Sequence, residues 1–272
     1  MPSLVREKKD NIIYWRVAFL EKRAPVKAVF SGRSGGSSRP PYASLNLGLH
    51  VGDDPAAVMF NRRLVAESLN LPLQNWVIGE QVHANRVARV GYQHAGRGVF
   101  EPATAVNGVD ALVTAEPQLV LVAFYADCVP LYLVDPRRRV IGLAHAGWKG
   151  SVLRIGSRVV NRMVKEFNCQ PADLLAFIGP AVGSCCYQVD NRVGQAVKNN
   201  LPWAEKVLTS DGPHHFRLDL PHTNYLDLLA AGLQPEHIGL ASICTCCHAD
   251  SFFSYRAAAG VTGRQAAILS LE

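Results

Sequence analysis

Three short segments of this chain contain the residue types that metal chemistry or nucleophilic catalysis requires. They are Gln81-Val82-His83, Ala126-Asp127-Cys128 and Ala144-His145-Ala146-Gly147-Trp148. Cys128 and His145 lie seventeen residues apart, separated by two apolar runs and a turn, which is the spacing of a hairpin that brings its ends together. If His83 joins them, two imidazoles and one thiol form a site that suits zinc with an open fourth position, as in a reaction centre.

Asp127 precedes Cys128 between the same apolar runs. An ionised carboxylate is costly to bury without a partner, so we expect Asp127 to meet a metal shell, a base or a cation. A buried cysteine by itself is usually a small hydrophobic residue, and a lone histidine usually belongs to the core. The predicted hairpin is what makes Cys128 and His145 candidates for metal ligands, or for a nucleophile and its base.

Two other segments have the composition of binding surfaces. Residues 31–41 form a Gly/Ser-rich loop whose backbone N–H groups could cradle an anion together with Arg33, although the loop lacks the Gly-Lys-Ser/Thr signature of a P-loop. Residues 252–256 combine three aromatic side chains with Arg256. That segment is either core with one surface arginine or a stacking wall beside an anion-binding group.

A cysteine-rich segment lies near the C-terminal end of the chain: Cys244-Thr245-Cys246-Cys247-His248. It resembles a metal knuckle, and a structural zinc usually needs a second half with similar spacing. The only other close pair of cysteines is Cys185-Cys186. Because adjacent cysteines bind one ion poorly together, the sequence disfavours a second metal site here.

Composition and charge are those of an ordinary globular protein. Of 272 residues, 49% are hydrophobic and 18% are charged, and the net charge of +6 suits an anionic small substrate such as phosphate. No Lys/Arg-rich block favours a nucleic-acid partner. The longest apolar runs, residues 119–126 and 129–134, are too short to span a bilayer. With seven cysteines and no secretory signal, we expect reduced thiols and a cytoplasmic protein without a membrane partner.

The pattern of elements predicts an α+β fold, a single domain over residues 1–272 with mixed, largely antiparallel β-sheets flanked by helices. An acidic N-cap before Pro55 predicts a helix that ends near Asn70. The loop from residue 91 to 108 is long enough for a lid or binding loop. Further helices are expected over 147–167, 191–200 and 221–231, and strands over 26–30, 76–83, 86–90, 109–113, 119–125, 129–134, 140–144, 173–179, 238–243, 252–255 and 265–269.

In these residues the chain resembles a known family, the YfiH-like proteins, also called the multicopper polyphenol oxidase or laccase-domain family. The matching segments follow one another along almost the whole chain. They are Ser44-Leu45-Asn46-Leu47-Gly48, His50-Val51-Gly52-Asp53-Asp54, Asn61-Arg62, Gln81-Val82-His83, Asp110-Ala111-Leu112-Val113-Thr114, Ala126-Asp127-Cys128-Val129-Pro130, Ala144-His145-Ala146-Gly147-Trp148, Ile178-Gly179-Pro180 and Phe252-Phe253-Ser254-Tyr255-Arg256.

The resemblance implies that His83, Cys128 and His145 hold a catalytic zinc ion. It also implies a fold similar to the catalytic domain of cytotoxic necrotizing factors. The implied activity is that of a purine nucleoside enzyme, which splits adenosine, inosine, guanosine and methylthioadenosine with phosphate and deaminates adenosine. We expect Asp127 to orient a ligand or exchange a proton. The expected residues for substrate and phosphate binding are Arg33, Asn46, Lys149 and Arg256.

Three other functions stay open. A copper-dependent, laccase-like polyphenol oxidase needs a type 1 copper and a trinuclear cluster held by His-x-His pairs, whereas this chain has nine histidines and no such pair. The Cys/His pair could instead work without metal, as a hydrolase acting on cell-wall peptides. A noncatalytic binding protein would release no product from any nucleoside.

Overall fold

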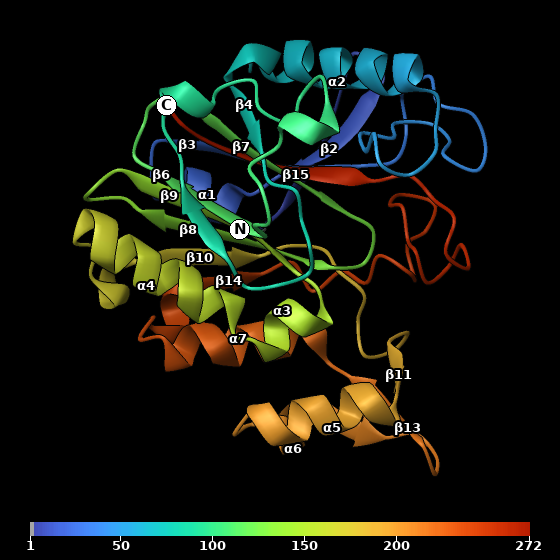
Figure 1. Ribbon diagram of the computed structural model, residues 1–272, viewed down its shortest axis with the longest axis vertical. Helices are drawn as coiled ribbons and strands as arrows, with labels where there is room; N and C mark the ends of the chain where they lie inside the picture. Colours follow the sequence, from blue (N-terminus) through green and yellow to red (C-terminus); the bar gives the residue numbers. More distant parts are fainter. Residues whose placement is uncertain (1–2) are drawn as a thin grey trace.

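Two six-stranded β-sheets form the centre of the computed structural model, which describes residues 3–272 (Figure 1). The strands of the first sheet are β1 (Val5–Lys9), β2 (Ile12–Arg16), β3 (Val26–Ser31), β4 (Trp76–Ile78), β7 (Val120–Tyr125) and β15 (Gln265–Leu271). Their order is β1-β2-β3-β15-β7-β4. All neighbours in this sheet are antiparallel except β4 and β7.

The second sheet contains the strands that carry the candidate chemistry. They are β5 (Val87–Arg89), β6 (Ala111–Thr114), β8 (Val129–Asp135), β9 (Val140–Ala146), β10 (Leu175–Ile178) and β14 (Ile238–Leu240). The order is β14-β10-β8-β9-β6-β5, with parallel pairing only at the two edges. Mixed, largely antiparallel sheets are therefore confirmed.

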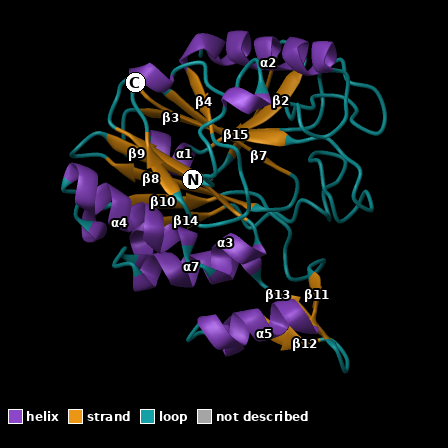
Figure 2. Ribbon diagram, in the orientation of Figure 1, coloured by secondary structure: helices purple, strands orange, loops and turns teal. Residues whose placement is uncertain are grey.

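Helices cover the outer face of each sheet (Figures 1 and 2). Helix α2 (Pro55–Leu69) lies on the first sheet, and α4 (Ile155–Phe167) and α7 (Leu220–Ala230) lie on the second. The inner faces of the two sheets meet in a shared apolar core that includes Tyr125 and Tyr132. The remaining helices are α1 (Ala18–Glu21), α3 (Trp148–Val152), α5 (Asn191–Asn200) and α6 (Ala204–Val207).

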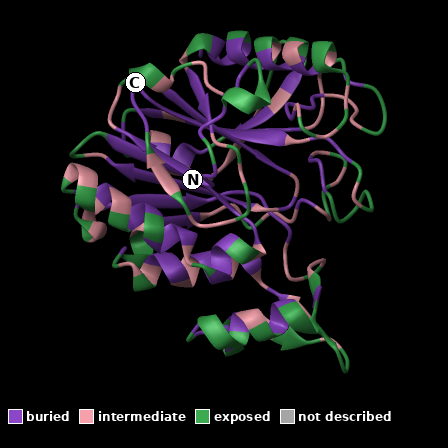
Figure 3. Ribbon diagram, viewed as in Figure 1, coloured by how far each residue is buried: buried purple, intermediate pink, exposed green. Residues whose placement is uncertain are grey.

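Strands β7, β8 and β9 are buried along their whole length (Figure 3). Each is covered on both faces, by the other sheet on one side and by helices on the other. A strand in that position has no solvent face, so its sequence is a continuous apolar run instead of an alternating one. This explains why the centre of the chain is its most hydrophobic part.

Strands β8 and β9 form the hairpin that the spacing of Cys128 and His145 predicts. Their register pairs Pro130 with His145. At the far end, the carboxylate of Asp135 accepts hydrogen bonds from two backbone N–H groups of the turn, at 3.0 and 2.9 Å. The turn fixes the register, and the register places Cys128, just before β8, beside the end of β9.

The helix predicted over residues 147–167 is in fact two helices, α3 and α4. Arg154 lies between them with φ of 59°, in the left-handed region, so the helical hydrogen-bond ladder cannot continue through it. Its guanidinium donates a hydrogen bond of 2.9 Å to Asp227 of α7. The bend lets α3 approach the site while α4 packs on the sheet.

The strand predicted over residues 252–255 is also wrong. The backbone N–H of Phe253 donates to the side-chain oxygen of Gln265 at 2.7 Å, and the side-chain nitrogen of Gln265 donates to the Phe253 carbonyl at 2.9 Å. Phe252 and Phe253 are both buried. The segment is apolar because two rings fill the core, and the amide of Gln265 replaces a neighbouring strand.

Five strands are absent from the sequence-based expectation: β1, β2 and a small sheet of three. The small sheet consists of β11 (Gln188–Asp190), β12 (Leu208–Ser210) and β13 (His215–Leu218), in the order β11-β13-β12. It lies beside α5 at one end of the molecule (Figure 2). Such short strands with charged or exposed residues give little periodicity to detect. Among residues 3–272, no helix combines the length and the apolar character needed to cross a bilayer.

Arg62 on α2 ties two loops to the helix from a buried position. Its side chain is 1% exposed and donates to the carbonyl of Leu47 at 2.9 Å, and also to the carbonyls of Gly98 and Val99. The guanidinium lies 4.8 Å from the ring centroid of Phe124 in β7. One cation thus holds the loops that close one end of the first sheet.

Replacing Arg62 by methionine should lower the free energy of unfolding by about 3 kcal/mol, because three buried carbonyl groups would lose a charged donor. Chemical denaturation followed by circular dichroism measures this change. The matched control is Arg63→Met, since Arg63 is exposed on the same helix and should contribute less than about 0.5 kcal/mol. Equal losses in the two variants would contradict the assignment.

Candidate active site

His83, Cys128 and His145 come together at one end of the second sheet. Their ligand nitrogen and sulfur atoms all lie within 4.8 Å of one another. The two imidazole rings are perpendicular, with centroids 4.8 Å apart. His83 comes from the loop after β4, Cys128 precedes β8, and His145 belongs to β9. The structure thus gathers the three residues that the sequence singles out.

The approach of these side chains depends on the glycine at position 147. A Cβ atom there would lie 3.0 Å from Cδ2 of His83 and 3.2 Å from Sγ of Cys128. The φ of Gly147 is −71°, which any residue can adopt. The glycine is therefore required for space at the centre, and not for backbone conformation.

Asp110, just before β6, holds both histidines in place. One carboxylate oxygen lies 3.0 Å from Nδ1 of His145 and accepts the backbone N–H of His83 at 2.9 Å. The other oxygen accepts the backbone N–H of Ala84 at 2.8 Å. Asp110 is buried, so its carboxylate needs these partners. One side chain thereby fixes an imidazole of the hairpin and the backbone of the loop that carries the other imidazole.

Asp110 also determines which nitrogen of His145 faces the centre. Burial raises the pKa of Asp110, but the hydrogen bonds from His145 and from the backbone of Ala84 and His83 outweigh it and hold the pKa below its usual value. An ionised carboxylate only accepts hydrogen bonds, so Nδ1 of His145 carries the proton. Nε2 is then free to act as a ligand or a base.

Gln81 directs His83 toward the centre. Its side-chain nitrogen donates to the carbonyl of Phe124 at 2.8 Å, and its side-chain oxygen accepts the N–H of Phe124 at 2.8 Å. Gln81 and His83 both have φ in the left-handed region, 57° and 59°. The strand predicted over 76–83 therefore ends at Ile78, because the following residues turn out of the sheet to present His83.

Cys128 and His145 shift each other's protonation in the metal-free protein. Burial raises the pKa of Cys128, but the charges and hydrogen bonds of His145 and His83 lower it to about 6. Burial lowers the pKa of His145, but Cys128 and Asp110 raise it to about 9. In the absence of metal, these mutual shifts favour a thiolate on Cys128 and a proton on His145. A thiolate is the form of cysteine that binds a soft cation or attacks a carbonyl.

The sequence predicts that Asp127 meets a metal shell, a base or a cation, whereas its hydrogen-bond partners in the structure are neutral donors. Its carboxylate accepts the hydroxyl of Thr245 at 2.6 Å and the backbone N–H of Arg256 at 2.6 Å. Neutral donors therefore satisfy this buried group. Its φ of 86° turns the chain between β7 and β8, and its side chain anchors the segment that carries Arg256.

The three convergent residues lie in a cavity of about 780 Å³. That volume holds a nucleoside-sized molecule with a small anion. Aromatic side chains contribute much of its wall: Phe124, Trp148, Tyr187 and Tyr255. Part of the loop expected as a lid or binding loop also lines it, at Gly98, Pro102, Ala103 and Ala105. The cavity therefore combines flat apolar surfaces with a polar centre.

Three arginines contribute positive charge to the wall of this cavity. Arg62, Arg264 and Arg256 all line it. The pKa of His50, which lines it too, falls to about 4, first because of burial and then because of the charges of Arg264 and Arg62. Both side-chain hydrogen bonds of Arg264 to described residues use Nη1, at 2.8 and 3.0 Å. An anion would be favoured beside these groups.

Of the four residues expected to bind substrate or phosphate, only Arg256 lines the cavity. Arg33 donates instead to the carbonyls of Ala43 and Ala249, and its loop lies outside the cavity wall. Lys149 is exposed and lies 5.7 Å from the ring of its neighbour Trp148. Asn46 is buried and accepts the backbone N–H of Arg264 at 2.8 Å, so it acts on the cavity through that residue.

Sequence reasoning missed Asp110, Gln81 and Arg264 as site residues. A signal existed for Asp110, because a carboxylate next to an apolar strand must find partners, as was argued for Asp127. Gln81 stands in a segment that the sequence singles out, but nothing in the pattern gives its side chain a role, and Arg264 carries no signal. Their roles depend on contacts with Phe124 and Asn46, which lie far away in the sequence.

Comparison with known proteins finds a matching family model and proteins of similar sequence. The family model described as "Multi-copper polyphenol oxidoreductase laccase" matches residues 27–272. The protein named purine nucleoside phosphorylase YlmD from Geobacillus stearothermophilus is 43% identical over 252 residues, covering 90% of both chains. That of Bacillus subtilis is 38% identical over 247 residues, covering 91% of this chain and 89% of the other.

Solved structures agree in fold. The crystal structure of YlmD from Geobacillus stearothermophilus superposes with a TM-score of 0.94 and 39% identity over the whole of both chains. The hypothetical protein YfiH from Bacillus licheniformis gives a TM-score of 0.92 and 37% identity over 97% of each chain. The extent of these matches and the shared α+β architecture show that this chain belongs to the laccase-like YfiH family.

Proposed function

We propose that this chain is a zinc-dependent purine nucleoside phosphorylase that acts on adenosine, inosine, guanosine and methylthioadenosine and also deaminates adenosine. One observation carries the proposal: two imidazoles and a thiol converge in a cavity that is lined by aromatic side chains and arginines. The names of the relatives support it. We treat residues 1–272 as one catalytic unit, of which residues 1 and 2 lie outside the described part.

The donors at the centre fit a zinc ion. His83, Cys128 and His145 would hold it, and two nitrogens with one sulfur are ligands that zinc accepts in catalytic sites. Asp110 already holds His145 in the ligand tautomer, and Gly147 leaves the centre clear of a side chain. When bound, zinc supplies a Lewis acid next to the reacting atoms.

The protein's own residues bind and orient the reactants. In phosphorolysis the bond between the sugar C1′ and the purine nitrogen breaks, a phosphate oxygen bonds to C1′, and the purine leaves with a proton. Tyr187 and Trp148 offer flat surfaces against which a purine can stack. We assign phosphate to Arg264 and Arg256, in place of Arg33 and Lys149. Asp127 is a positioning residue that holds the backbone of Arg256.

A copper-dependent polyphenol oxidase would agree with the description of the family, but the arrangement of the possible metal ligands disfavours it. Within residues 3–272, potential ligands gather in two groups, and neither contains more than two histidines. A trinuclear copper cluster requires many more imidazoles around one point. Metal analysis distinguishes zinc from a single copper ion at His83, Cys128 and His145.

The metal-free hydrolase has a specific observation in its favour, the thiolate–imidazolium pair of Cys128 and His145. The likeness to the catalytic domain of cytotoxic necrotizing factors, which stays a prediction, would point the same way. The approach of His83 to the pair favours a metal, because a nucleophile and its base need only one imidazole. A zinc ion that is lost when Cys128 is replaced by alanine would favour the phosphorylase, and the absence of such an ion would favour the hydrolase.

Replacing Cys128 by alanine should abolish both zinc binding at this site and turnover, because it removes the only sulfur ligand. The assay incubates adenosine and inosine with and without phosphate, measures the free purines and the inosine formed, and determines bound metal by elemental analysis. Thermal melting of the variant controls for folding. Turnover retained by a Cys128→Ala protein that has lost the metal ion of this site would sink the scheme.

Replacing Arg264 by methionine should raise KM for phosphate by about tenfold or more, since a hydrogen bond from a charged donor contributes about 1.5–3 kcal/mol. Steady-state kinetics with varied phosphate measures this. Adenosine deamination consumes no phosphate and should change little. Lys149 is an exposed cation outside the cavity, so Lys149→Met should leave both reactions unaltered. A phosphate KM that responds to Lys149 and ignores Arg264 would reverse the assignment.

Replacing Asp110 by asparagine should weaken zinc binding by about 10- to 100-fold, because the carboxylate that orients His145 and the loop of His83 is lost. Competition with a chromophoric chelator measures the affinity. Asp127→Asn is the matched control, since Asp127 is equally buried but bonds to neither histidine. If both variants bind zinc as the unmodified protein does, Asp110 has no such role.

A further inference from the structure

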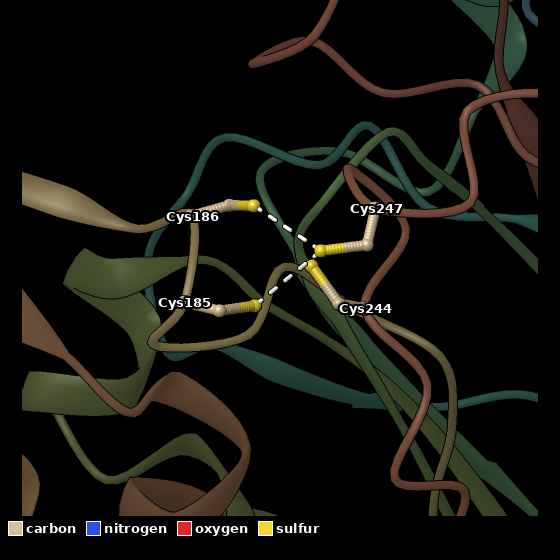
Figure 4. A group of neighbouring side chains, drawn as sticks. All are labelled: Cys185, Cys186, Cys244 and Cys247. Atoms are coloured by element: carbon tan, nitrogen blue, oxygen red, sulfur yellow. Dashed lines mark hydrogen bonds between the residues drawn. The ribbon is translucent and has the colours of Figure 1, made fainter.

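Four cysteine sulfurs converge on a second point, outside the cavity. Cys185 and Cys186 follow β10, and Cys244 and Cys247 follow β14. Their sulfur atoms all lie within 4.8 Å of one another (Figure 4). Sγ of Cys247 is 3.6 Å from that of Cys185 and 3.4 Å from that of Cys186. Cys185 and Cys247 are exposed, so burial of apolar surface does not explain why these side chains gather.

The two loops are held together by their backbones. The N–H of Ala181 donates to the carbonyl of Ile243 at 3.2 Å, and the N–H of Thr245 donates to the carbonyl of Ala181 at 3.0 Å. The N–H of Gly183 donates to Sγ of Cys244 at 3.2 Å. A backbone N–H that points at a sulfur stabilises a thiolate there. The four side chains are therefore presented by a scaffold that exists without any ligand.

We propose that Cys185, Cys186, Cys244 and Cys247 bind one structural zinc ion as thiolates. Zinc–sulfur bonds of about 2.3 Å in a tetrahedron place the sulfurs about 3.8 Å apart, close to the separations observed here. Cys244 and Cys247 also have the C-x₂-C spacing of zinc knuckles. The site is closed, since all four positions are filled by protein, so the ion holds structure and does no chemistry. This assignment is independent of the proposed function.

Two other fates of the cysteines fit the geometry less well. A disulfide needs sulfurs about 2.0 Å apart and joins only two of them, whereas Cys247 lies almost equally far from Cys185 and Cys186. An iron–sulfur cubane spreads its four thiolates further apart than a single ion does. A single tetrahedral ion that prefers thiolate ligands is the simplest occupant, and zinc is the usual one.

The sequence disfavours this site because adjacent cysteines are expected to bind one ion poorly, and the structure shows how the difficulty is avoided. Successive side chains of an extended strand point to opposite faces. Cys185 and Cys186 lie in a turn closed by the N–H of Cys186 on the carbonyl of Gly183, at 3.0 Å. Figure 4 shows both sulfurs directed toward the Cys244–Cys247 loop.

The proposed ion would fasten one wall of the cavity. Tyr187, which lines the cavity, directly follows Cys186, and the Cys244–Cys247 loop leads into the segment that carries Tyr255 and Arg256. Nη2 of Arg256 donates to the carbonyl of Gln188 at 2.8 Å, joining the two segments again. Loss of the ion should therefore loosen both sides of this wall.

Metal content tests the inference in protein purified under reducing conditions. The unmodified chain should contain two zinc ions, and Cys128→Ala should contain one. Adding Cys185→Ser and Cys247→Ser to Cys128→Ala should remove the last ion, whereas Cys246→Ser in the same background should keep it, because Sγ of Cys246 is not one of the four sulfurs that converge. Zinc that ignores Cys185 and Cys247, or follows Cys246, would overturn the site.

Cobalt substitution gives a readout that needs no cluster variant to fold. Co²⁺ added to metal-free Cys128→Ala should bind one ion per chain and show the intense visible bands and thiolate charge-transfer absorption of tetrahedral CoS₄. Because Cys128 is absent from this protein, the result does not depend on the proposed enzymatic function. Absence of these bands, iron in place of zinc, or a disulfide within the cluster in freshly purified protein would contradict the zinc assignment.

Discussion

The buried carboxylate of Asp110 is the constraint on which the candidate active site depends. It lies just before β6 in a buried position, where an unpaired charge would be very costly. Three groups satisfy it: Nδ1 of His145 and the backbone N–H groups of His83 and Ala84. The same hydrogen bonds that make the carboxylate tolerable in the core also set the tautomer of one histidine and the path of the loop that carries the other. Folding stability and site geometry therefore rest on the same contacts.

The site stands where the two sheets meet. Gln81 joins the loop of His83 to Phe124 in β7 of the first sheet, while Cys128 and His145 come from the β8–β9 hairpin of the second. Strands buried on both faces move little, so the hairpin fixes the thiol and the imidazole firmly. The cavity opens beside this junction, where loops supply Tyr187, Tyr255, Arg256 and Arg264 to its wall.

The features that could be predicted from the sequence are those that depend on residues close together in the chain. The apolar runs and the turn at Asp135 predict the hairpin, and the hairpin predicts that Cys128 meets His145. Arginine roles could not be predicted this way: Arg33 lies in a loop that suggests anion binding, yet its guanidinium serves two carbonyls, while Arg264 reaches the cavity from a position with no distinctive pattern. Long side chains go where tertiary contacts direct them. The strand predicted over 252–255 is wrong for a related reason, because buried aromatic residues such as Phe252 and Phe253 give the same apolar pattern as a buried strand.

The two clusters of potential ligands differ as a reaction centre and a structural site should. The first has three donors, one of them deeply buried on a rigid strand, and a glycine that keeps its remaining side clear. The second has four sulfurs, all from loops, and faces solvent. Loops that form a binding wall have few buried contacts to hold them, so a cross-link contributes most there. The proposed zinc ion would hold together the loops of the cavity wall, which the strands do not support. This role explains why exposed cysteines gather at that position.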